Sequence, residues 1–238
     1  MTAKKRRIFF LTGARSEYDI LYPVLERLSS DERVEIGIIA VGAQLSPFHG
    51  MGIRQIESEG FPVVGKIESL LSSESWQGRS LSFAHLIEGL TRLLESNRPD
   101  VICIAGDREE ALAAALVANF LGIFVAHLFG GDRCIASDID EVLRPAISKL
   151  SHLHFTASEG HRQRLIRMGE ESDKVWATGG TGLDRLRTSA DVADEELCRQ
   201  FGIDVSKPFF LLIHHPSPMF GTSDAGEEMN EVLRGVLS

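Results

Sequence analysis

Short apolar runs recur along the chain and alternate with stretches of helical periodicity. The runs occupy residues 8–11, 34–41, 100–105, 123–128, 153–157 and 174–178. Continuous apolar runs of this length are typical of strands that are buried on both faces of a sheet. Strands that alternate strictly with helices predict an α/β fold, here a Rossmann-like, doubly wound parallel sheet with helices on both faces.

The helices are expected between these runs, where apolar residues recur every three or four positions. The expected ranges are about 17–28, 51–59, 80–97, 111–121 and 158–168. Ser16 and Ser158 are candidate N-caps, because a serine hydroxyl can accept from the first free N–H groups of a helix. Gly122 is expected to cap the end of the alanine-rich helix.

The last fifty residues change in character and predict a domain boundary. A glycine-rich turn at 179–184 precedes an acidic, irregular segment, and a new apolar run at 208–215 is followed by a helix from residue 227. We therefore expect an N-terminal Rossmann-like domain at 1–188, a linker at 189–205, and at 206–238 the beginning of a second Rossmann-like domain.

Composition excludes several classes of function. The formal net charge is -9 and no basic stripe offsets it, which argues against nucleic acid as a partner. No stretch approaches the roughly 20 apolar residues of a membrane span. Three well-separated cysteines without a CxxC pair favour a reducing, cytoplasmic location, and no spacing suggests a metal site.

Candidate chemistry follows two consecutive apolar runs. The first is followed by Asp107 and Glu110, the second by Asp132, Asp140 and Arg144. Because parallel strands present their carboxyl ends at one edge, both acidic turns are expected to face the same crevice. Asp140 and Arg144, at i and i+4 on a helix, would share a face and could pair.

The turn after the first strand, Thr12 to Ser16, is a further candidate. A strand that leads directly into a helix aims backbone N–H groups at the crevice, which suits an anion, and Arg15 would add a positive charge. The alternative is an ordinary strand-to-helix turn with a solvent-exposed arginine.

As a set, several motifs resemble the hydrolysing UDP-N-acetylglucosamine 2-epimerases of the sialic and legionaminic acid pathways. They lie in the same order over nearly the whole chain, at 12–18, 41–46, 106–112, 127–132, 139–155, 179–184 and 215–216. The resemblance implies the first domain of a two-domain, GT-B-type architecture, with only the start of the second domain present. It implies a UDP-sugar substrate, no cofactor, and a homo-oligomer of two or four subunits.

The resemblance also assigns roles to residues. Asp107 and Asp140 would be the acid/base pair, and His215 would assist the departing phosphate or the proton transfer. Substrate-binding positions would be Gly13, Arg15, Gln44, Glu110, His127, Arg144 and Gly180. From the residues alone, Asp107 could instead cap a helix, Asp140 and Arg144 could be a surface ion pair, and His215 could be a buried strand-end histidine.

Three positions depart from the family pattern. Phe129 stands where many relatives carry glutamate or histidine, so Asp132 is the nearest substitute base. Gln44 and Pro145 stand where relatives often have histidine. Because proline disfavours helical geometry in the preceding residue, the helix here could begin at Pro145 instead of earlier.

The leading hypothesis is a 2-epimerase that eliminates UDP from UDP-N-acetylglucosamine, or from a related UDP-2-acetamido sugar, and hydrates the resulting glycal to an N-acetylmannosamine-type product. Two alternatives remain open. One is a nucleotide-sugar binding or regulatory module without catalysis, and the other is a GT-B glycosyltransferase, which shares the architecture.

Overall fold

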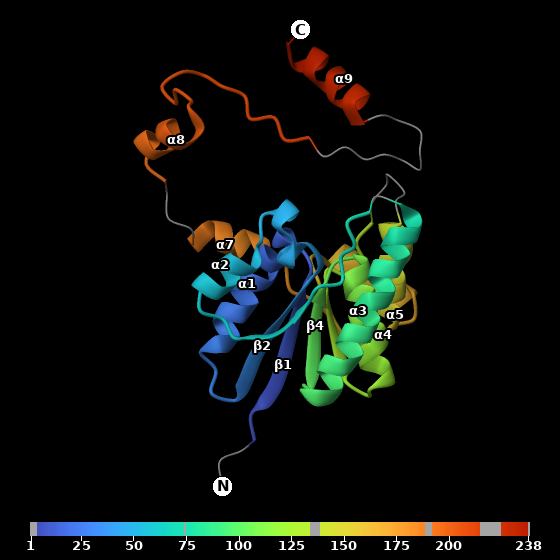
Figure 1. The fold of residues 1–238 in the computed structure, drawn as a ribbon. Helices are drawn as coiled ribbons and strands as arrows, with labels where there is room; N and C mark the ends of the chain where they lie inside the picture. The colour runs from blue at the N-terminus through green and yellow to red at the C-terminus, as the bar shows by residue number, and fades with distance from the viewer. Residues whose placement is uncertain (1–3, 74, 134–138, 189–191, 215–224, 238) are drawn as a thin grey trace. The chain divides into compact units, whose positions relative to one another are not determined.

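A single parallel sheet organises the larger part of the chain (Figure 1). The computed structural model describes residues 4–73, 75–133, 139–188, 192–214 and 225–237. The seven strands follow the order β3-β2-β1-β4-β5-β6-β7 and every pair is parallel. Their bounds are β1 Arg6–Thr12, β2 Val34–Val41, β3 Val63–Ile67, β4 Val101–Ala105, β5 Phe124–Leu128, β6 Leu153–Thr156 and β7 Val175–Ala177. The predicted Rossmann-like α/β sheet is thus confirmed.

Helices cover both faces of this sheet (Figure 1). One face carries α1 (Arg15–Ser29), α2 (Ile53–Ser58) and α7 (Gly182–Thr188), and the other carries α3 (Trp76–Ser96), α4 (Glu109–Phe120) and α5 (Asp140–Lys149). The helix α6 (Glu159–Arg167) precedes β7 and packs against it. Short 3-10 turns occupy Gly42–Leu45, Pro47–His49 and Ser172–Lys174.

Alternation of side chains along β1 explains why both faces are covered. Phe9 and Leu11 of β1 belong to the core under α3 and α4, whereas Phe10 belongs to the core under α1 and α2. All three side chains are at most 2% exposed. Each buried side chain of this size stabilises the fold by about 1.5–3 kcal/mol, so one strand contributes to both layers.

The strand order reverses between β1 and β4. β2 and β3 extend from β1 in one direction, and β4 to β7 extend in the other. Connections leave such a point toward opposite faces, so the loops after β1 and β4 diverge and leave a crevice at the carboxyl edge. The register keeps the two strands level there, with Phe10 opposite Cys103.

Several predicted boundaries are corrected. Ser158 does cap α6, and its hydroxyl accepts from the N–H of His161. Ser16 is not a cap, because α1 begins at Arg15 with Ala14 as the N-cap. The helix α5 begins at Asp140, so Pro145 lies inside it and does not start it. The glycine-rich turn is shorter than expected, since α7 begins at Gly182.

The described residues from Thr188 onward form a second compact unit, separate from the unit made by residues up to Arg133 and Ile139–Arg187. The second unit holds α8 (Asp194–Phe201) and α9 (Ala225–Leu237). The predicted strand at 208–215 is wrong for the part described, since residues 208–214 form no strand. A strand needs a neighbouring ladder, and none pairs with this segment among the described residues; Phe210 is 91% exposed.

Within the part of the chain that the structure describes, no helix combines the length and apolar character needed to cross a bilayer.

Candidate functional site

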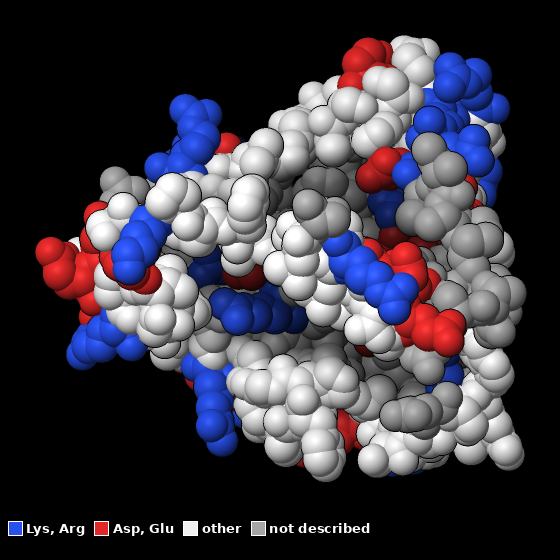
Figure 2. All heavy atoms as spheres, turned by 90° about the horizontal axis from the view of Figure 1, so that it is seen from above, with Lys and Arg blue, Asp and Glu red and all other residues white. Residues whose placement is uncertain are grey.

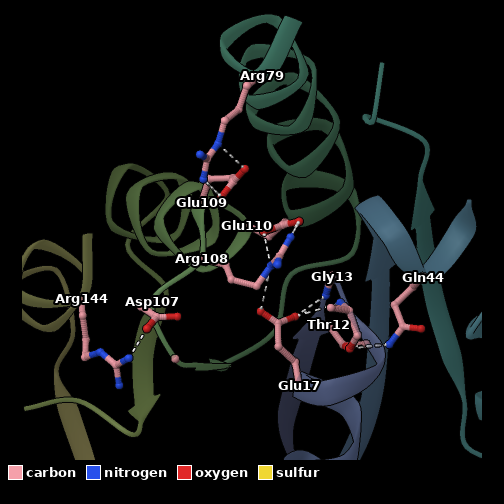
Figure 3. A network of polar contacts seen from close by, with 12 residues as sticks. Thr12, Gly13, Glu17, Gln44, Arg79, Asp107, Arg108, Glu109, Glu110 and Arg144 are labelled. Atoms are coloured by element: carbon pink, nitrogen blue, oxygen red, sulfur yellow. Dashed lines mark hydrogen bonds and ion pairs between the residues drawn. The ribbon is translucent and has the colours of Figure 1, made fainter. Parts of the chain in front are cut away.

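The carboxyl edge of β1, β4 and β5 carries several of the charged residues singled out in the sequence, among them Asp107, Glu110 and Arg144 (Figure 3). Asp107 lies two residues after the end of β4, and Arg144 reaches it from the second turn of α5. The guanidinium of Arg144 donates to the Asp107 carboxylate and, at 3.1 Å, to the carbonyl of Phe129. The Arg144 side chain is only 13% exposed, so the contact is made in a largely desolvated position.

Asp132 belongs to the same group of charges. One oxygen lies 3.6 Å from Nη1 of Arg144 and the other lies 3.3 Å from Nε2 of His161 in α6. The Asp132 side chain is 46% exposed, so it remains accessible from the crevice. Arg144 therefore joins Asp107 and Asp132, which follow different strands.

Backbone geometry positions the loop between Phe129 and Asp132. Phe129 has φ 65°, an unusual conformation for a bulky residue and one that is found most often where the surrounding structure imposes it. Arg144 and the N–H of Phe129, which donates to Phe155 O at 2.9 Å, hold this residue from two sides. Arg164 of α6 donates to the carbonyl of Gly131.

Asp140 is the first residue of α5 and is half-buried. Its charge acts on Arg79 at the start of α3. The hydrogen bonds from Arg79 to Glu109, both 2.9 Å, raise the pKa of the guanidinium, and the negative charge of Asp140 adds to this effect. Both acids are thus placed relative to Arg144. Asp140 lies one turn before Arg144 in α5, and Asp107, in the loop after β4, contacts Arg144 directly.

The turn after β1 differs from the prediction. The N–H groups of Gly13 and Ala14 were expected to be available to an anion, but both donate to Oε2 of Glu17, at 2.6 and 3.1 Å. The side chain of Arg15 is 77% exposed, and its Nε lies 4.0 Å from Asp19. The carboxyl group of Glu17 therefore occupies the N–H groups expected to bind a ligand anion.

Glu17 is a residue that sequence reasoning missed. It is 6% exposed, and burial raises its pKa to about 7, with the charge of Glu110 adding to the shift. Arg108 lies between the two acids, with two 3.1 Å hydrogen bonds to Glu110 and 3.8 Å from its Nε to Glu17 Oε1 (Figure 3). The available signal was Glu17 at the third helical position, where an acid commonly binds the cap backbone.

Two predicted substrate contacts are buried. The His127 ring is 0% exposed and lies 2.8 Å from Gly106 O and 3.1 Å from Ser148 Oγ, and burial lowers its pKa to about 4. The neutral ring donates from Nε2 to the carbonyl before Asp107, so it holds the loop. Gln44 is 1% exposed and donates to Thr12 Oγ1 and Ala14 O at 2.9 and 2.8 Å. Neither side chain reaches the surface, and both hold turns of the site through these hydrogen bonds.

Gly180 and Glu110 complete the set of predicted positions that are described. Glu110 is bound by Arg108 and is 6% exposed, so its carboxylate faces the protein interior. Gly180 lies between β7 and α7, next to Thr181, whose hydroxyl donates to Ile20 O in α1. His215 lies outside the described residues.

Space and charge at this edge are compatible with a polar ligand. Asp132, Glu141 and Arg144 line a cavity of about 250 Å³ together with residues of α6. On the face seen in Figure 2, acidic and basic side chains of the described residues lie interspersed. No group of three or more acid, histidine or cysteine ligands suited to a metal ion occurs in the described ranges.

The parallel sheet, whose strand order reverses between β1 and β4, places the protein in the class of Rossmann-like α/β proteins. In this class ligands generally bind at the carboxyl edge of the sheet, where this chain carries its acids and arginines. The chain belongs to the family described as UDP-N-acetylglucosamine 2-epimerase, which matches residues 26–238.

Similar proteins agree with this assignment. The chain is 37% identical over 211 residues to the UDP-N,N'-diacetylbacillosamine 2-epimerase (hydrolyzing) of Legionella pneumophila, covering 89% of this chain and 55% of the relative. It is 31% identical over 212 residues to the GDP/UDP-N,N'-diacetylbacillosamine 2-epimerase (hydrolyzing) of Campylobacter jejuni, with the same coverage.

A solved structure shares the fold: the UDP-GlcNAc 2-epimerase of Neisseria meningitidis bound to UDP-GlcNAc, at TM-score 0.67 and 23% identity, with 82% of this chain and 51% of that chain covered. The chain spans about half the length of the curated relatives it matches.

Proposed function

We propose that this chain supplies the acid- and arginine-bearing wall of a hydrolysing 2-epimerase that acts on a UDP-linked 2-acetamido sugar. The observation that carries the proposal is the contact of Arg144 with Asp107 and Asp132, because it brings carboxylates from two strand ends to one point of the crevice. Membership of the epimerase family and the names of the two hydrolysing relatives support the reaction type.

The proposed reaction has two steps. A carboxylate removes the proton from C2 while the C1–O bond to UDP breaks, so that a C1=C2 double bond forms. Water then adds its hydroxyl to C1, and a proton returns to C2 on the other face. Each proton needs a positioned acid or base, and neighbouring carboxylates can take separate roles because each affects the pKa of the other.

The roles assigned to the residues follow from the resemblance and from their positions. Asp107 and Asp140 are proposed as the acid/base pair, and Asp132 as a second base, since Phe129 leaves that part of the loop without a carboxylate. Arg144 orients Asp107 and Asp132. His215 is proposed to assist the leaving phosphate.

The proposed substrate is a UDP-sugar with a 2-acetamido group. We propose UDP-N-acetylglucosamine or UDP-N,N'-diacetylbacillosamine, because solved and curated relatives carry these two names. The product would be an N-acetylmannosamine-type sugar used for sialic or legionaminic acids. The resemblance to the epimerase family also supports a cytoplasmic homo-oligomer. Light scattering of the purified protein would test the oligomeric state.

The deciding experiment incubates the two-domain protein that contains this wall with each UDP-sugar in deuterated water. The expected result is release of UDP, seen by chromatography, with one deuterium at C2 of the free sugar. Asp107→Asn should abolish this turnover, whereas the exposed Asp173→Asn should not change it. Tight binding of a UDP-sugar without any UDP release would instead identify a binding module, and release that requires an acceptor would identify a transferase.

A further inference from the structure

Glu17 is positioned by the start of its own helix. Its Oε2 accepts from the N–H groups of Gly13 and Ala14, the two residues that connect β1 to α1. These bonds satisfy donors that a helix start leaves open, and they point the carboxyl group inward. The side chain is 8% exposed, so its other oxygen is also removed from solvent.

That second oxygen is in an unusual position. Glu17 Oε1 has no hydrogen-bond partner among the residues that the structure describes. The nearest positive charge is Arg108, 3.8 Å away at Nε, but the guanidinium directs two 3.1 Å hydrogen bonds to Glu110. The side chains of Glu17 and Glu110 are 8% and 7% exposed, so two ionised acids beside one arginine would leave a net negative charge on buried carboxylates, which is costly.

A proton on Glu17 Oε1 resolves both difficulties. It cancels the excess charge, and it converts the unpartnered acceptor into a hydroxyl that can rotate toward Glu110. The groups that face Glu17 are Glu110 of α4, Arg108 before α4, and the two N–H groups of its own turn. Burial and the charge of Glu110 outweigh the opposing effects of Arg108 and the two N–H groups and hold the pKa of Glu17 at about 7.

The surrounding backbone leaves little freedom to this cluster. A Cβ atom at Gly13 would lie 2.8 Å from Cγ of Glu110, and one at Gly42 would lie 2.9 Å from its Oε1. Glu110 is therefore enclosed by the turns after β1 and β2. Arg108, which Glu110 holds, directly follows Asp107, so the cluster sets where the Asp107 loop can lie (Figure 3).

We propose that Glu17 is a positioning residue of the site: as a neutral acid it completes the contact between the β1–α1 turn and the Arg108–Glu110 pair, and thereby fixes the loop that carries Asp107. The effect on turnover rests on the proposed function. The proton on Glu17 and its effect on Arg108 do not depend on that function, and both are measurable on the chain itself.

The first test follows the Arg108 Nε–H and Asp107 N–H resonances by NMR between pH 5 and 9. In the wild type both should shift with a midpoint near the pKa of Glu17, about 7. In Glu17→Gln, whose amide resembles the neutral acid, this titration should disappear and the signals should stay near their low-pH positions. Glu26→Gln, on the exposed part of the same helix, should titrate like the wild type. A titration that persists in Glu17→Gln overturns the proposal.

The second test measures kcat and KM for UDP release. Glu17→Gln should keep kcat within about threefold and lose the pH dependence near neutrality, whereas Glu17→Ala should lower kcat by roughly 10- to 100-fold with little change in KM, because a displaced loop misplaces Asp107. A folded Glu17→Ala with normal kcat overturns the positioning role. If the wild type releases no UDP, the proposed function fails, and the NMR titration still decides the state of Glu17.

Discussion

The guanidinium of Arg144 donates to the carboxylate of Asp107, although 37 positions separate the two residues in the sequence. The contact joins the loop after β4 to the helix after β5. It also places Arg144 within 3.6 Å of Asp132, so one side chain orients two candidate acid/base groups.

Arg144→Lys should lower turnover by roughly 10- to 100-fold while leaving the fold intact. Lysine keeps the charge but lacks the planar fork that reaches Asp107 and the carbonyl of Phe129 together. The rate of UDP release and the circular dichroism spectrum are the measurements. Arg167→Lys, at an exposed position of α6, is the matched control. Equal rates in the two variants would contradict the role given to Arg144.

The stability of the protein should decrease as pH falls from about 6.5 to about 4, in part because of His127. Burial lowers the pKa of this ring from 6.5 to about 4, so the unfolded chain binds a proton in that interval and the folded chain does not. The stabilisation is fully present above pH 6.5, and its loss by pH 4 amounts to on the order of 3 kcal/mol.

Urea unfolding at pH 4.5 and 7 would measure this effect. His127→Gln should reduce the difference between the two pH values, since glutamine does not titrate. His49→Gln, at an exposed position, should leave that difference unchanged. An unaltered pH dependence in His127→Gln would show that other groups account for the acid sensitivity.

Gly131→Ala should be more destabilising than Gly50→Ala, although both glycines have similar positive φ values, 78° and 83°. At Gly50 the added Cβ meets nothing within 4 Å, so only the backbone strain of about 1 kcal/mol applies. At Gly131 it would lie 2.4 Å from the carbonyl oxygen of His161, which adds roughly 1–3 kcal/mol of overpacking.

Chemical denaturation of the two glycine variants would give the comparison directly. The Gly131 variant should also release UDP more slowly, because its loop carries Asp132. Similar free energies of unfolding for both variants would mean that the loop moves away from α6 without cost.

Arg185→Ala should loosen α7 without unfolding the sheet. Arg185 donates to Asp19 of α1 at 2.7 Å and to Glu59 at 2.8 Å, and its guanidinium lies 4.0 Å from the ring centre of Tyr22. Because the Arg185 side chain is only 22% exposed, these contacts should contribute about 1–3 kcal/mol to the packing of α7 against α1.

Hydrogen exchange resolved by residue is the measurement for α7. Amide protons of residues 182–187 should exchange roughly 5- to 150-fold faster in Arg185→Ala, the ratio that such an energy implies. Arg187→Ala, exposed on the same helix, should not accelerate them. Faster exchange in β1 and β4 as well would indicate global destabilisation instead.

The expectations that came from the residues themselves succeeded where local pattern and burial point the same way. Val34–Val41 is mostly apolar, follows the charged Arg33 and ends at a glycine, and it forms β2 with those bounds. Ser158 caps α6 because the signal, a hydroxyl before a helical pattern, depends only on neighbouring residues. By contrast, Phe209 to Ile213 has the composition of a buried strand, yet no strand forms in the described residues there, because a strand requires a partner that local sequence does not specify.

Sequence alone determined six of the seven strands, most of the covering helices and the family, since hydrophobic periodicity and motif order can be read along the chain. The edge strand β3 (Val63–Ile67) and the helix α7 (Gly182–Thr188) were not expected. Only the tertiary structure decided which charged side chains of the site contact one another. Arg144 does share α5 with Asp140, but its contacts with Asp107 and Asp132 were not expected, and Glu17 occupies N–H groups expected to bind an anion. Electrostatic energies depend on distances and burial across segments far apart in sequence, and these exist only after the strands have aligned their carboxyl ends.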